Sequence, residues 1–309
     1  MKSWKIGAIA GLVAGIVAGI FGIIIALIKF KIGFLYFWAP PLPDMPFIII
    51  AMTKFTIIFI WGIILGIIYS RIHDLIPGKG ILKGLIFGLT YYLIFNIRNV
   101  TFMIAYGFYP LVIGAFLYIS PIIYGLMLGI LYKAPKEKMK VTEHDLKSGI
   151  IPGAITGLIF GIAAQISFIM STYFGFIFVF TEVIPDYLTD IGFIIAQIGN
   201  HVWINMLWYA IFGAFYAKFY DRIPGKSLVK GAIFGLIMWL IANVPNSVYH
   251  LVYGQLGAAT QWGLFSPEFY IFPGLLLEGF YKKRTRAILM AGVIFAIHII
   301  KVAVVGLLS

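Results

Sequence analysis

Nine long apolar stretches run through this chain, and they restrict its fold more than any other feature. Each holds about 20 residues, the length that a helix needs to cross the hydrocarbon core of a bilayer. They cover residues 7–28, 47–70, 81–105, 111–132, 149–172, 191–217, 227–252, 264–281 and 287–308. Hydrophobic residues make up 62% of the 309 and charged residues 11%, against about 45–50% and about 25% in soluble domains. The sequence therefore predicts an all-α, polytopic membrane protein with nine transmembrane helices.

Basic residues between these stretches predict the orientation. Of the 23 Lys and Arg residues, 18 lie in alternate connections, beginning with the segment before the first stretch. The intervening connections carry Asp44, Glu182, Asp186 and Asp190. By the positive-inside rule, we expect a cytoplasmic N-terminus and an external C-terminus in the inner or plasma membrane. The net charge of +12 then reflects topology and contact with membrane lipid, and no nucleic-acid partner is expected.

An internal duplication appears when 147 is added to the residue numbers of one segment. Residues of 69–107 then meet identical residues of 216–254; the matches include Tyr69 with Tyr216, Asp74 with Asp221, Ile76-Pro77-Gly78-Lys79 with Ile223-Pro224-Gly225-Lys226, and Asn96 and Asn99 with Asn243 and Asn246. The first and fifth stretches match at a shift of 146. Since each repeat holds four stretches, an even number, both enter from the same side, and the repeats are predicted to be parallel.

This duplication predicts the domain organisation. A first four-helix repeat covers 1–132, a charged cytoplasmic linker 133–148, a second four-helix repeat 149–283 and one extra C-terminal helix 284–309. Glycine recurs every fourth residue in the first helix of each repeat: Gly7, Gly11, Gly15 and Gly19, and Gly149, Gly153, Gly157 and Gly161. Such a glycine zipper lets another backbone approach closely. It favours tight helix packing, with close approach of a ligand as the alternative.

Several motifs are weaker than they look. The repeated Ile-Pro-Gly-Lys lacks the first glycine of a phosphate loop, since His73 and Tyr220 stand there, and a tight cytoplasmic turn is the better interpretation. The absence of Cys excludes thiol catalysis. Ser247 and His250 share a helix face but have no orienting group. No metal site and no cofactor are expected, although haem ligation by His201 or His250 stays open, as does the question of whether the protein is an enzyme.

A layer of polar residues crosses the apolar stretches of both repeats. All six Asn lie in the third, sixth and seventh stretches. Counted from the outer ends of the helices at about 1.5 Å per residue, four of these Asn, together with a Lys, an Arg and a His, lie on the order of 10–15 Å below the outer surface. Its members predict a basic, Asn-lined binding pocket between the repeats: Lys54, Asn96, Arg98, Asn99, His201, Asn243 and Asn246.

Two observations bear on what that pocket holds. No acidic residue lies at its depth to neutralise Lys54 and Arg98, which favours an anion over a cation. Gln165 and Lys301 fall in the same half of the membrane. Simpler alternatives are hydrogen bonds of Asn between helices and snorkelling of Lys54 to the headgroups.

The second repeat resembles a family of four-span membrane proteins of unknown function. The resemblance rests on His201, the turn at Pro224-Gly225 and the pattern Gly231-x-x-Phe-Gly-x-x-x-Trp-Leu240. It covers residues 149–254 and, more weakly, 7–107, where Lys54 and Tyr92 replace the His and the Trp. The resemblance implies a four-span fold for each repeat and no particular activity.

The function predicted from these features is a membrane carrier or binding protein. Its ligand would be an anionic or amphiphilic small molecule or a lipid headgroup phosphate, held in the outward-facing pocket. The alternative is a non-catalytic subunit or scaffold of a larger membrane complex, with other membrane subunits as partners.

Overall fold

The computed structural model is built from α-helices, and in its described part short 3-10 turns follow two of them. It describes residues 3–31, 47–105, 119–134, 145–173, 191–242 and 267–308. Within these ranges there are nine α-helices, one in each of the nine apolar stretches, which confirms the expected all-α fold. Three segments of the described chain are long and apolar enough to cross a membrane: Ser3–Ile25, Lys147–Ser167 and Thr285–Val304.

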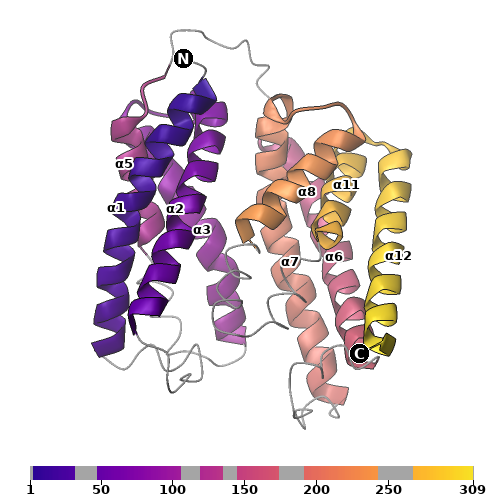
Figure 1. The fold of residues 1–309 in the computed structure, drawn as a ribbon. Coiled ribbons are helices and arrows are strands. Elements are labelled where there is room, and N and C mark those ends of the chain that lie inside the picture. The colour runs from indigo at the N-terminus through magenta and orange to yellow at the C-terminus, as the bar shows by residue number, and fades with distance from the viewer. Residues whose placement is uncertain are drawn as a thin grey trace. The chain divides into compact units, whose positions relative to one another are not determined.

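The chain forms two compact units, Met1–Val141 (unit 1) and Thr142–Ser309 (unit 2). Unit 1 contains α1 (Ser3–Lys31), α2 (Phe47–Ile72), α3 (Ile81–Ala105) and α5 (Ser120–Leu131), with the 3-10 turn η2 (His73–Leu75) after α2. In this unit α1 packs along α2, α3 packs along α5, and α5 also contacts α1 (Figure 1).

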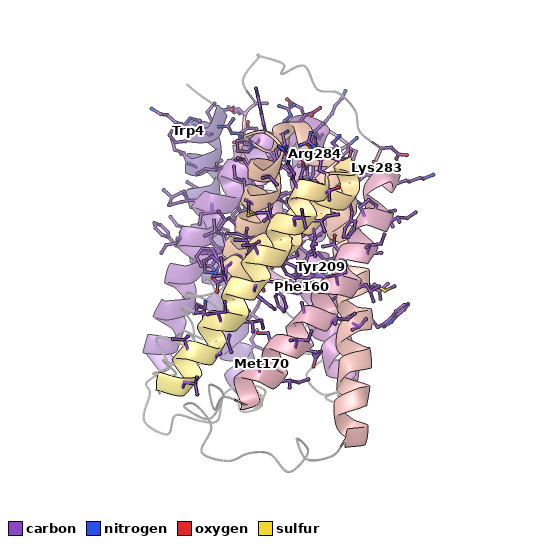
Figure 2. All side chains as sticks on the ribbon, turned by 90° about the vertical axis from the view of Figure 1, so that its right-hand side faces the viewer. Trp4, Phe160, Met170, Tyr209, Lys283 and Arg284 are labelled. Carbon is purple, nitrogen blue, oxygen red and sulfur yellow. The ribbon has the colours of Figure 1, made fainter. Side chains whose placement is uncertain are left out.

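Unit 2 has the same order of helices and one more. It contains α6 (Lys147–Tyr173), α7 (Ile191–Phe219), η4 (Tyr220–Arg222), α8 (Leu228–Ala242), α11 (Glu268–Lys282) and α12 (Thr285–Leu308). Here α6 packs along α7 and α8 packs along α11, as their counterparts do in unit 1. The extra helix, α12, packs on α11 and α6. Figure 2 labels Phe160 of α6 and Tyr209 of α7 together in the interior of this unit, where their ring centroids are 5.0 Å apart.

Glycine makes the closest helix pairs possible. A Cβ atom on Gly11 of α1 would lie 2.2 Å from the carbonyl oxygen of Gly62 in α2, and one on Gly153 of α6 would lie 2.1 Å from that of Tyr209. Such separations are far inside van der Waals contact, so any side chain at either position would push the two backbones apart. The prediction of tight packing along these glycine faces is confirmed.

The contacts also fix how α1 corresponds to α6. Gly7 faces Gly66 and Ser70, and Gly149 faces Gly213 and Ala217, the residues 147 positions later. Gly149 therefore takes the place of Gly7, a shift of 142 rather than the 146 expected from sequence. Since both helices carry glycine every fourth residue, sequence matching alone slides by one turn without losing the glycine matches.

The two Ile-Pro-Gly-Lys segments are turns of the same shape. Gly78 has φ of +92° and Gly225 of +90°, and the residues two positions later, Gly80 and Ser227, both have φ of +48°. Glycine adopts these left-handed conformations without strain. The geometry confirms the interpretation of this motif as a tight turn, which brings the next helix back beside the one before it.

Candidate functional site

The predicted pocket lies largely beyond what the structure describes. The backbone positions of Lys54, Asn96, Arg98, Asn99 and His201 are helical, in α2, α3 and α7. The placement of these five side chains lies outside the described part, and Asn243 and Asn246 lie outside the described residues altogether. Whether the seven residues share one cavity therefore stays a prediction.

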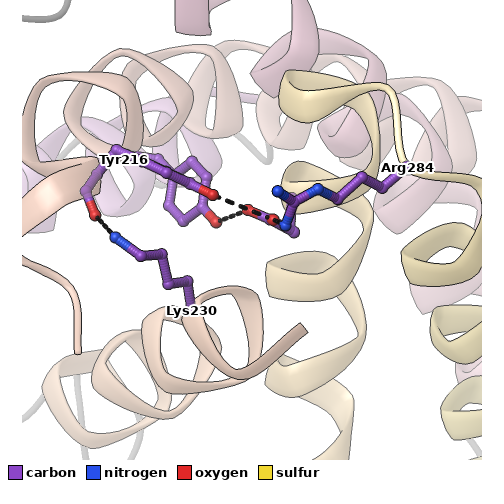
Figure 3. Close-up of polar contacts among 5 residues, drawn as sticks. Tyr216, Lys230 and Arg284 are labelled. Carbon is purple, nitrogen blue, oxygen red and sulfur yellow. Dashed lines mark hydrogen bonds and ion pairs between the residues drawn. The ribbon is translucent and has the colours of Figure 1, made fainter. Parts of the chain in front are cut away.

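The most elaborate polar site in the described part surrounds a fully buried carboxylate, Glu278 of α11. Its relative exposure is 0%. Tyr216 Oη donates to Glu278 Oε2 at 2.5 Å, and Tyr220 Oη donates to Oε1 at 3.2 Å. The guanidinium of Arg284 reaches Oε1 at 2.6 Å (Figure 3). A buried charge needs this kind of pairing, because its desolvation is costly.

Local structure explains how these groups meet. Helix α11 ends at Lys282, and Lys283 follows in the left-handed conformation with φ of +52°. The chain reverses there, and the amide of Arg284 donates to the carbonyl of Gly279 at 2.8 Å. Arg284 thus returns over the end of α11 that carries Glu278. Gly231 of α8 makes room for the Glu278 side chain, since a Cβ atom on Gly231 would lie only 3.0 Å from the Cβ atom of Glu278.

Tyr220 joins this site to the neighbouring lysines. Lys230 Nζ donates to the carbonyl oxygen of Tyr220 at 2.5 Å, and both Lys230 and Lys282 place their ammonium groups 4.2 Å from the Tyr220 ring centroid. Cations at this distance are attracted to the ring face. Burial, and then the nearby Glu278 charge, raise the pKa of Tyr220 to about 12, so its hydroxyl stays protonated as a donor near neutral pH.

Unit 1 contains the same framework of rings. Tyr69 packs edge-on against His73 and Tyr132 at centroid distances of 5.4 and 5.3 Å, as Tyr216 packs against Tyr220 and Tyr281 at 5.5 and 5.8 Å. The matching lysine makes the matching bond, because Lys83 Nζ donates to the carbonyl of His73 at 2.6 Å. Three aromatic or imidazole positions and one lysine therefore keep their geometry between the units.

The carboxylate is the principal difference between them. Gly84 of unit 1 packs against Gly129, as Gly231 of unit 2 packs against Glu278. Gly129 therefore stands where unit 2 has its buried acid. Burial also lowers the pKa of His73, which occupies the position of Tyr220. The two units share a scaffold at this end, and the charged site belongs to unit 2.

A second polar cluster in unit 2 lies at the other end of α11. Glu268, the first residue of α11, accepts hydrogen bonds from Lys301 and, at 3.1 Å, from His298 Nδ1, both on α12. Lys301 and Gln165 had been predicted to lie in the same half of the membrane as the pocket. The structure shows that Lys301 pairs with Glu268 and that Gln165 is buried.

Sequence reasoning missed both clusters, although signals for them exist. Glu268 and Glu278 are the only two of the eleven acidic residues that fall within the apolar stretches, and an acid at such a position calls for a partner. Arg284 follows Glu278 by six residues, and Tyr216 and Tyr220 are one helical turn apart. Their convergence depends on packing between α7, α8 and α11, which no local pattern encodes.

Among known proteins, no family profile, no curated protein and no solved structure matches this chain. The resemblance of the second repeat to four-span membrane proteins therefore stays a prediction.

Proposed function

We propose that the chain is a nine-span inner-membrane protein made of two parallel four-helix repeats and one added helix, with its N-terminus in the cytoplasm. The equivalent helix pairs, turns and ring clusters of the two units support the duplication. Exposed apolar side chains support the membrane location. On α12, for example, Leu289, Val293, Ile297 and Ile300 are between 51% and 66% exposed, a surface suited to lipid rather than water.

We further propose that the protein binds or carries an anionic or amphiphilic molecule, lipid phosphates included, in its outer half. The pocket would be lined by Lys54, Asn96, Arg98, Asn99, His201, Asn243 and Asn246. Arg98 would be the fixed charge, because a guanidinium remains protonated and can hold a phosphate or carboxylate with two hydrogen bonds. Lys54 would add a second charge, and the Asn amides would orient the ligand.

One observation carries this proposal: the acids of the apolar stretches are already engaged. Glu278 pairs with Arg284, and Glu268 pairs with Lys301. Both pairs form within unit 2, so neither carboxylate is left over for Lys54 or Arg98 in unit 1. Positive charge inside a bilayer is costly without a counterion. An anionic ligand would supply negative charge beside Lys54 and Arg98, which neither Glu268 nor Glu278 is free to provide.

Native mass spectrometry of the purified protein tests the proposal. The unaltered chain is expected to retain an anionic small molecule or lipid, and Arg98→Ala to lose it. Loss of a charged hydrogen bond weakens binding by about 1.5–3 kcal/mol, which is roughly a 10- to 150-fold change in affinity. The matched control is Arg71→Ala, since Arg71 is exposed at the end of α2, away from the predicted pocket, and should retain the ligand. Equal retention by both variants, or co-purification of protein subunits without any anion, would favour the scaffold alternative.

A further inference from the structure

Three helices of unit 2 bring a serine, a histidine and a carboxylate into one hydrogen-bonded line. Ser167 Oγ of α6 lies 2.8 Å from His298 Nε2 of α12, and His298 Nδ1 lies 3.1 Å from Glu268 Oε1 of α11. The serine contacts one ring nitrogen and the carboxylate contacts the other. In this order the carboxylate orients the imidazole and leaves Nε2 able to take a proton from the hydroxyl.

The surroundings of the line are apolar and close to the lipid-facing surface. His298 lies 13 residues beyond the start of α12, about 20 Å along the helix at about 1.5 Å per residue. The Phe269 ring lies against the imidazole, with centroids 4.7 Å apart. Ser167 is 9% exposed, whereas its neighbour Ile166 and the neighbour of His298, Ile297, are 43% and 51% exposed. An acyl chain in the bilayer could therefore approach the serine from the side.

We propose that Ser167 is the nucleophile of an intramembrane acyl-transfer site that acts on esters of amphiphiles. Ser167 Oγ attacks the ester carbonyl carbon while His298 Nε2 accepts the hydroxyl proton. The bond from that carbon to the alcohol oxygen then breaks, and the alcohol leaves with the proton from His298. Water next attacks the acyl-serine through the same base, which releases a carboxylic acid and restores the serine. Glu268 is a positioning residue, and Lys301 holds the same carboxylate oxygen that His298 Nδ1 contacts.

This site is separate from the proposed anion pocket. It uses residues of unit 2 alone, and its readout is a covalent mark on one named serine. If Arg98→Ala retains the ligand, the anion pocket is wrong but the acyl-transfer site is not contradicted. If Ser167 is not labelled, the acyl-transfer site is wrong but the anion pocket is not contradicted.

The first experiment treats the purified full-length protein with a long-chain alkyl fluorophosphonate and locates the adduct by peptide mass spectrometry. We expect modification of Ser167 in the unaltered chain. Ser70→Ala is the matched control, because Ser70 is also buried but donates to a backbone carbonyl, that of Ile67, at 2.7 Å. Labelling should persist in Ser70→Ala and disappear in Ser167→Ala. Labelling of Ser167 in the unaltered protein no faster than that of Ser148, an exposed serine without such a base, would overturn the proposal.

A second experiment separates chemistry from packing. His298→Gln should slow labelling at least 100-fold, since general-base assistance contributes roughly 100- to 10,000-fold. Glu268→Gln should slow it less and change the pH dependence of the labelling rate, which loss of a purely structural contact would not do. Release of p-nitrophenol from p-nitrophenyl esters should be faster for twelve-carbon than for four-carbon acyl chains. Unchanged labelling in His298→Gln would assign the hydrogen-bonded line to helix packing alone.

Discussion

The buried Glu278 site gives the sharpest test of how unit 2 is held together. Arg284→Met would remove the guanidinium that lies 2.6 Å from a carboxylate with no solvent exposure, and would keep much of the side-chain volume. Two donors, Tyr216 and Tyr220, would remain on that carboxylate. The buried negative charge would then lose the arginine that bonds it directly.

The size of the effect follows from burial. Removing one partner of a fully buried ion pair costs about 3–5 kcal/mol, and removing a charged hydrogen bond costs about 1.5–3 kcal/mol. The Arg284 side chain is 41% exposed, so water can reach the place it vacates and solvate part of the charge. We therefore expect a loss of about 2–3 kcal/mol. For a unit of this size, that corresponds to a fall in Tm of roughly 4–12 °C.

The assay is thermal unfolding in detergent, followed by intrinsic fluorescence. Arg286→Met is the matched control, because Arg286 is an exposed arginine in the first turn of α12 and loses the same charge. Adding Glu278→Gln to Arg284→Met should recover part of the lost stability, because the buried charge is gone. The reasoning fails if Arg284→Met lowers the Tm no more than Arg286→Met does.

Three further predictions test the fold and its charges. Gly66→Ala should destabilise unit 1 by about 1–3 kcal/mol and lower the Tm, because the new Cβ atom would lie 2.2 Å from the Gly7 carbonyl oxygen. The control is Gly292→Ala, which should not lower the Tm because a Cβ atom there would have nothing within 4 Å. A reporter fused after Ser309 should be external and one placed within 134–147 cytoplasmic; a cytoplasmic C-terminus would contradict the count of nine spans. Burial lowers the pKa of His73 in the folded protein below the pKa of about 6.5 that it has in the unfolded chain. The folded state is therefore most stable above pH 6.5, where His73 is neutral, and it loses stability as the pH falls from there through the lowered pKa. Between pH 8 and 5 the unaltered chain should therefore lose more Tm than His73→Tyr, which installs the residue that unit 2 carries; parallel losses would refute the assignment.

Helices were predictable because the apolar stretches are long and their ends are marked. The third stretch, 81–105, coincides with α3 (Ile81–Ala105), which follows directly after the Pro-Gly-Lys turn. Pro fixes one backbone angle and Gly supplies a positive φ, so the turn is encoded within a few residues. The same local information predicted the glycine face of α1. It did not predict which residues of α6 correspond to those of α1, because a four-residue period matches itself after one turn.

The polar sites were much harder to predict because they join residues far apart in the chain. Ser167 and His298 are 131 positions apart, and Tyr216 and Glu278 are 62 apart. Each is an ordinary residue in its own stretch. Their proximity follows from the packing of α6, α7, α11 and α12, which depends on side-chain volumes along whole helices. The duplication could not reveal these sites either, since Gly129 stands at the place of Glu278 in the other unit.

That difference between the units restricts how the two halves of an ancestral gene could diverge. Glu278 is fully buried, whereas Arg284 is partly exposed and could be present without its partner at little cost. A lineage that acquired the pair would more easily gain the arginine before the glutamate, because the intermediate then has no unpaired buried carboxylate. A lineage that lost it would discard the glutamate before the arginine. Homologous sequences with arginine alone should therefore outnumber those with the acid alone, whichever repeat is closer to the ancestor.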